Sequence, residues 1–148
     1  MKKVLIVCSF IFAAIFSSNA QEISDNAIGL RLGSNDGFGS EISYQRKLKE
    51  NNRLEVNLGL RDAFSDVKLT GLYQWVWNLE DKFNWFAGAG GGIYDANRTS
   101  LFASGVIGIE YSFDIPLMIS IDYRPEIGIT GNLDGLNSDL GLSVRYQF

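Results

Sequence analysis

The chain has 148 residues with a net charge of −4, of which 46% are hydrophobic, and it contains one cysteine and no histidine. This length suits a single domain, and the acidic balance argues against a nucleic-acid-binding protein. Without histidine, a Ser–His or Cys–His nucleophile cannot be assembled, so we expect no conventional hydrolytic enzyme.

Residues 1–20, MKKVLIVCSFIFAAIFSSNA, have the organisation of a secretory signal peptide. Two lysines precede an apolar stretch that is short for a membrane-spanning helix, and Ser18 and Ala20 stand at the −3 and −1 positions of a cleavage site. A retained anchor helix is the alternative. Cleavage would remove Cys8 and both lysines, leaving a domain of residues 21–148 with 11 basic and 17 acidic residues, a net charge of −6.

Eight segments of alternating hydrophobicity follow, each bounded by Gly, Asn, Asp or Pro, as is typical of β-strands. In chain order they are 27–34, 37–48, 53–62, 66–79, 83–95, 101–113, 117–129 and 139–148. Short connections between them indicate an antiparallel meander. Eight strands are also enough to close a barrel whose interior is just filled by side chains.

The alternation gives each strand an apolar and a polar face but does not say which one lies inside. A lipocalin-like soluble barrel would enclose the apolar face, whereas a membrane barrel would turn it toward lipid. Most strand glycines share the polar face, where a narrow lumen needs small residues beside long charged ones. The apolar face carries more large side chains than eight strands can enclose. The sequence therefore predicts an all-β, eight-stranded antiparallel up-and-down transmembrane β-barrel with its polar face inside.

Aromatic residues of the apolar face gather toward one end of the predicted barrel, as an interfacial girdle requires. Even strands end, and odd strands begin, at the end where the first strand starts. The predicted girdle consists of Tyr44, Trp75, Trp77, Trp85, Tyr111 and Phe113, and Phe83, Tyr146 and Phe148 are predicted to lie in the same ring.

Charged residues of the polar face are predicted to fill the lumen with ion pairs, because buried charges must be paired or hydrogen-bonded. The predicted network consists of Arg31, Glu41, Glu55, Arg61, Lys68, Glu110, Asp122, Arg124, Glu126 and Arg145. Two of these carboxylates could serve hydrolysis as an acid and base pair. The cations on the same face favour a structural plug instead.

The closing stretch GLSVRYQF alternates apolar residues at Leu142, Val144, Tyr146 and Phe148 up to the last position. This pattern resembles the C-terminal signature of bacterial outer-membrane β-barrel proteins, within which the size suggests the small eight-stranded group of the OmpA barrel domain and OmpX-like proteins. The resemblance implies that the barrel-assembly machinery recognises the last strand, which pairs with the first. It also implies residence in the outer membrane, in contact with its lipid and lipopolysaccharide. The short loops depart from that group, whose extracellular loops are usually long.

Two further segments allow more than one interpretation. Pro125 interrupts a predicted strand, and we expect it to face lipid at a β-bulge. The loop 130–139 offers Asn and Asp oxygens that calcium could bind, but their spacing is that of ordinary turns.

Taken together, these features predict a non-enzymatic, monomeric outer-membrane protein with a plugged lumen and a membrane-structural or surface-interaction role. A narrow pore or transporter for small solutes is the alternative. We expect no cofactor, no metal and no nucleic-acid partner. Short loops weaken the surface-interaction role, and charges along the whole lumen weaken the transport role.

Overall fold

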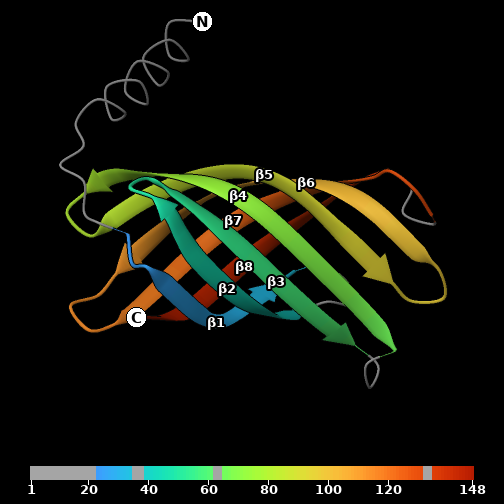
Figure 1. Cartoon of the computed structure of the whole chain (residues 1–148), viewed down its shortest axis with the longest axis horizontal. Coiled ribbons are helices and arrows are strands. Elements are labelled where there is room, and N and C mark those ends of the chain that lie inside the picture. The colour runs from blue at the N-terminus through green and yellow to red at the C-terminus, as the bar shows by residue number, and fades with distance from the viewer. Residues whose placement is uncertain (1–22, 35–38, 62–64, 132–134) are drawn as a thin grey trace, which may run out of the picture.

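The computed structural model describes residues 23–34, 39–61, 65–131 and 135–148, which form eight β-strands (Figure 1). The predicted signal peptide, residues 1–20, lies outside the described residues. The strands are β1 (Asn26–Gly33), β2 (Ser40–Lys49), β3 (Asn52–Arg61), β4 (Asp66–Glu80), β5 (Phe83–Asp95), β6 (Thr99–Ser112), β7 (Leu117–Gly128) and β8 (Leu136–Gln147). All eight predicted strands are present, and each boundary lies close to the predicted one.

The strands form a closed antiparallel barrel in which each strand pairs with the next and β8 pairs with β1. The closing register runs from Ala27 opposite Gln147 to Gly33 opposite Gly141. Closure leaves no free strand edge, whose backbone groups lipid could not satisfy. Figure 1 shows the C-terminus near the start of β1. We call this the terminal end of the barrel, where Asn26 begins β1, and the opposite end the loop end, where Gly33 ends it.

The predicted orientation of the two faces is confirmed. Arg31, Arg124 and Arg145 are among the most deeply buried side chains, with at most 1% of their surface exposed. Outward-facing side chains such as Leu30 and Leu140 are each 56% exposed. A barrel that buries arginine and exposes leucine inverts the arrangement of a water-soluble barrel, so the lipocalin-like alternative is wrong.

The lumen also contains an apolar cluster that the sequence analysis did not predict. Leu72, Val76, Phe86 and Val106 project inward from β4, β5 and β6 and pack with Ile23, which precedes β1. These residues alternate in step with neighbouring polar residues that also point inward. They therefore lie on the face that was predicted to be polar. The interior therefore has a charged part and an apolar part.

The bulge predicted at Pro125 is wrong. The β7–β8 register continues unbroken through Pro125, which lies opposite Ser138. The β6–β7 register is the same on both sides of it, although the pairing itself is interrupted there. Pro125 faces outward, as expected, and a Cβ on Gly105 of β6 would lie 3.5 Å from its ring. The strand thus accommodates proline by facing it with a glycine.

Candidate functional site: the charged lumen

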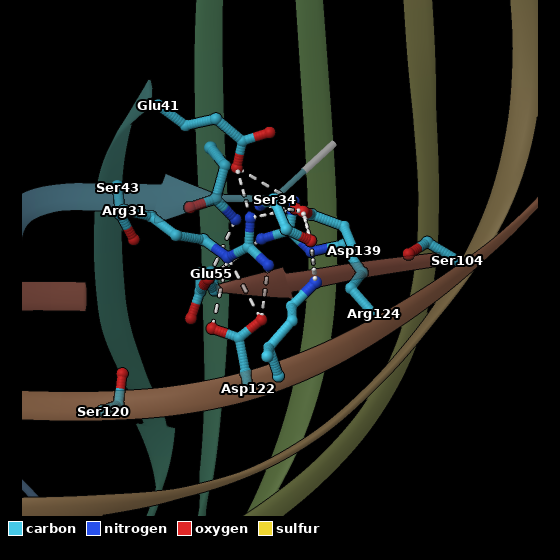
Figure 2. Close-up of polar contacts among 12 residues, drawn as sticks. Arg31, Ser34, Glu41, Ser43, Glu55, Ser104, Ser120, Asp122, Arg124 and Asp139 are labelled. Carbon is cyan, nitrogen blue, oxygen red and sulfur yellow. Dashed lines mark hydrogen bonds and ion pairs between the residues drawn. The ribbon is translucent and has the colours of Figure 1, made fainter. Parts of the chain in front are cut away.

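Arg31 of β1 lies at the centre of the largest group of ion pairs in the lumen (Figure 2). Its guanidinium donates to Asp122 of β7, with Nη2 2.6 Å from Oδ1, and to Asp139 of β8, with Nη1 2.5 Å from Oδ2. Glu41 of β2 lies 3.5 Å from the same Nη1. Three carboxylates from three strands therefore surround one cation that has no exposed surface.

A glycine makes room for this arginine. A Cβ on Gly141 of β8 would lie 2.4 Å from Cζ of Arg31, so any larger residue there would displace the guanidinium. Likewise, a Cβ on Gly33 would lie 2.5 Å from a carboxylate oxygen of Asp139. Here the polar-face glycines act as the sequence analysis expects, as space for long charged side chains.

Arg124 of β7 extends the network across the full width of the barrel. Its Nη1 donates to Glu41 of β2 at 3.0 Å, and its Nη2 lies 3.9 Å from Glu55 of β3. In a ring of eight strands, β3 and β7 stand opposite each other. This contact therefore bridges the lumen from wall to wall.

Glu55 also binds several side chains on the side of this bridge that is nearer the terminal end. It accepts hydrogen bonds from Gln45 at 2.6 Å, Asn57 at 2.8 Å and Gln74 at 2.9 Å. Arg145 of β8 lies 3.3 Å from it. A buried carboxylate with three donors and a cation is well compensated for its lost hydration.

Arg145 is fixed by its own hydrogen bonds as well as by Glu55. It donates to the hydroxyl oxygens of Ser43 on β2 at 2.9 Å and Ser120 on β7 at 2.8 Å. Small hydroxyl side chains leave space for the guanidinium and satisfy its donors at the same time.

A second ion pair lies nearer the terminal end. Arg53 Nη2 of β3 is 2.7 Å from Glu110 Oε2 of β6, and Arg53 Nε donates to Gln74 at 2.7 Å. The guanidinium also lies over the ring of Phe86, 4.9 Å from its centroid, within the range of a cation–π contact. Through Gln74 and Glu55, this pair joins the central network.

A third ion pair lies toward the loop end. Lys68 of β4 donates to both carboxylate oxygens of Glu126 on β7, at 2.8 and 2.7 Å. Its ammonium lies 5.1 Å from the ring centroid of Phe102. Both charged side chains are less than a tenth exposed.

Nine of the ten residues predicted for the network have described side chains, and all nine are buried and lie in ion pairs. They are Arg31, Glu41, Glu55, Lys68, Glu110, Asp122, Arg124, Glu126 and Arg145. The side chain of Arg61 lies outside the described part of the structure. Sequence reasoning missed Arg53 and Asp139. Arg53 is an even number of residues from Glu55, and Asp139 is an even number from Arg145. Period-two alternation could therefore have placed both residues on the inner face.

One small hollow lies in the described part of the lumen. A hollow of about 10 Å³ lies at the terminal end between Gln45, Lys47, Arg53, Glu110 and Gln147, which is room for about one water molecule. Within the described ranges, no group of three or more acidic residues is arranged to hold a metal ion, and no helix is long and apolar enough to span a membrane.

The aromatic residues predicted for the girdle lie toward the terminal end, on the outer surface. Trp77 and Trp85 stand opposite each other on β4 and β5, with ring centroids 4.3 Å apart. Tyr111 contacts Phe113 at 4.9 Å between ring centroids. Tyr44 lies opposite Ile28 in β1. Trp75, on the same face of β4, is largely exposed.

The other aromatic residues predicted for this ring lie in the same band. Phe83 stands opposite Tyr111, with ring centroids 4.7 Å apart. Tyr146 lies opposite Ile28 across the β1–β8 closure, and its ring stacks on that of Phe148. The aromatic band therefore continues into the closing strand that carries the predicted assembly signal.

Comparison with protein-family models and with curated protein sequences gave no match. Several solved structures share the fold. A barrel reported as "De novo design of transmembrane beta-barrels" has a TM-score of 0.65 at 13% identity, covering 87% of this chain and 99% of that chain. Neisserial surface protein A has a TM-score of 0.56 at 15% identity, covering 83% and 94%. The designed barrel TMB2.3 has a TM-score of 0.58 at 15% identity, covering 86% and 97%.

These similarities are too distant in sequence to extend beyond the fold, but on the fold they agree. The chain is a closed eight-stranded antiparallel barrel of the kind found in small transmembrane barrels, Neisserial surface protein A among them. The resemblance seen in its last strand led to the same fold.

Proposed function

We propose that this chain is an integral outer-membrane protein with a membrane-structural role, whose lumen is closed by its own side chains and whose working surface is its lipid-facing wall. The observation that carries the proposal is the bridge from Arg124 to Glu41 and Glu55, which crosses the lumen between opposite walls. A lumen crossed by buried, mutually paired charges is expected to leave no continuous path for solutes.

The outer surface supports insertion into a membrane. Large apolar side chains on all eight strands are exposed, for example Ile28, Ile121 and Leu142 at 45–50%. In water such a surface would be a severe aggregation hazard, since exposed apolar patches on soluble proteins are small. Because about half of each side chain is already covered by its neighbours, each gains about 1 kcal/mol in lipid.

The connections at the loop end favour the structural role over the surface-interaction role. They comprise only residues 34–39, 62–65, 96–98 and 129–135. Such short loops offer little area for a protein partner, because stable interfaces usually need about 800 Å² on each side. The lipid-facing wall is the largest surface that remains.

The lumen carboxylates also support a non-enzymatic role. Glu55, Glu110 and Asp122 each accept from or pair with buried cations or amides, so none is free to act as a general acid or base. We infer a monomer without cofactor, located in the outer membrane with both termini in the periplasm. Its partners are membrane lipid, lipopolysaccharide and, through the last strand, the barrel-assembly machinery.

A narrow pore remains the second candidate because charged residues extend along the whole lumen, from Arg53 near the terminal end to Lys68 near the loop end. Single-channel conductance of the purified chain in planar bilayers distinguishes the two. The plugged barrel is expected to give no discrete openings after its folding has been verified by heat-modifiable gel mobility. Regular openings from a correctly folded sample would refute the plug, and a channel-forming porin in the same bilayers is the positive control.

A further inference from the structure

A short segment that belongs to no strand closes the terminal end of the lumen. Residues 23–25 precede β1, and Ile23 is only 9% exposed although it lies at the mouth of the barrel. Its side chain completes the apolar cluster of the lumen, which otherwise consists of Leu72, Val76, Phe86 and Val106. An aliphatic residue from outside the strands is thus buried against the inner wall of β4, β5 and β6.

Hydrogen bonds hold this segment between the last strand and the second. Ser24 accepts from the side-chain amide of Gln147 at 3.2 Å, and the carbonyl of Asp25 accepts from the backbone N–H of Lys47 at 2.8 Å. Asn26 and Phe148 exchange two backbone hydrogen bonds of 3.0 and 2.9 Å, which extend the closing pair by one step. Ile23 is therefore placed by contacts to both sides of the mouth.

The surroundings of Ile23 show what it separates. The hollow of about 10 Å³ at the terminal end is lined on one side by Ile23 and Ser24 and on the other by polar side chains such as Gln45 and Asn84. Ile23 belongs both to the lining of this hollow and to the apolar cluster, so we expect loss of its side chain to connect the two. Water would then reach Val76 and Phe86, which are now at most 3% exposed.

We propose that Ile23 is a stopper that seals the apolar half of the lumen at its periplasmic mouth and that opens without unfolding the barrel. Within the described residues, the segment is held by a few hydrogen bonds and one buried side chain, whereas each strand is paired with a neighbouring strand on both sides. Elements with few contacts open locally at low free-energy cost while the rest of a structure stays intact. The terminal end of the lumen can thus open while the charged network at its centre stays closed.

Thiol labelling tests this proposal, because a Cys8→Ser background removes the only native cysteine. A reporter is introduced as Val76→Cys in the apolar cluster, and a matched one as Thr70→Cys in the same strand, at a buried position in the charged part of the lumen. The folded barrel in lipid vesicles is treated with a membrane-impermeant maleimide. Each reporter is compared with Ile23 intact, with Ile23→Gly, and with Ile23→Val as the conservative control.

Ile23→Gly is expected to speed labelling of the Val76→Cys reporter by about tenfold or more, whereas Ile23→Val leaves it within about twofold. The Thr70→Cys reporter should stay slow in all three, and gel mobility should stay that of the folded barrel. Equal labelling of the Val76→Cys reporter with and without the isoleucine side chain would overturn the proposal. A parallel rise at both reporters would overturn it too, because the barrel would then have loosened as a whole.

Discussion

Removing the Arg31 guanidinium should be one of the most destabilising single substitutions in the barrel. In Arg31→Met, a side chain of similar length replaces the cation and leaves Asp122 and Asp139 buried without the contacts of 2.6 and 2.5 Å that they now make. Each hydrogen bond to a charged group contributes about 1.5–3 kcal/mol. Breaking a buried ion pair by removing one partner typically costs about 3–5 kcal/mol. We therefore expect a loss of about 4 kcal/mol, a large share of the 5–15 kcal/mol typical of a folded domain.

Urea titration of the barrel in lipid vesicles measures this loss, with gel mobility and tryptophan fluorescence as readouts. Arg98→Met is the matched control, since it makes the same change at an exposed position between β5 and β6 and should stay within about 0.5 kcal/mol. The double variant Arg31→Met with Asp122→Leu should recover part of the loss, because an apolar pair can replace a buried ion pair at little cost. A loss below about 1 kcal/mol in Arg31→Met would refute the view that these charges depend on one another.

Two more substitutions test the wall and the closing strand. Gly90→Ala should destabilise the barrel by about 1–3 kcal/mol or block folding, because its Cβ would lie 1.9 Å from the carbonyl oxygen of Gly71. Gly39→Ala, with nothing within 4 Å, is the neutral control in the same urea titration. Tyr146→Asp combined with Phe148→Asp should reduce membrane insertion in cells by about tenfold or more, while Leu136→Asp at the loop end of β8 should not. Equal insertion of both variants, measured in outer-membrane fractions, would remove the assembly role from the last residues.

Strand positions and faces could be predicted from the sequence because period-two alternation depends only on local geometry and on which side meets lipid. The same rule assigned Arg31 and Arg124 to the lumen without any knowledge of their partners. It could not identify those partners. Arg124 meets Glu55 because β7 lies opposite β3 in the closed ring, and it meets Glu41 on β2, the strand beside β3, so both contacts depend on how the whole sheet closes.

The glycines show a second limit of the sequence argument. The sequence predicts that polar-face glycines make space for long charged side chains, and Gly141 beside Arg31 does so. Gly90 serves another purpose, since a Cβ there would collide with the backbone of β4. The two cases look alike in sequence. They differ in what a Cβ would meet, a side chain beside Gly141 and backbone beside Gly90, and alternation does not encode that difference.

Two repeated layers explain how this narrow lumen is filled from the wall to the axis. A Cβ on Gly92 would lie 2.0 Å from the carbonyl oxygen of Leu69 and 2.7 Å from the ring of Phe102, so glycine lets both lie close to it. The ring supports Lys68, which binds Glu126.

The second layer has the same order: Phe86 lies against Gly108 and supports Arg53, which pairs with Glu110. In both layers, glycine permits an aromatic ring, the ring provides an apolar support for a cation, and the carboxylate neutralises it. Substituting the glycine should therefore disturb an ion pair that it does not touch. Such a coupling would make the lumen side chains and the wall of the barrel one packed unit.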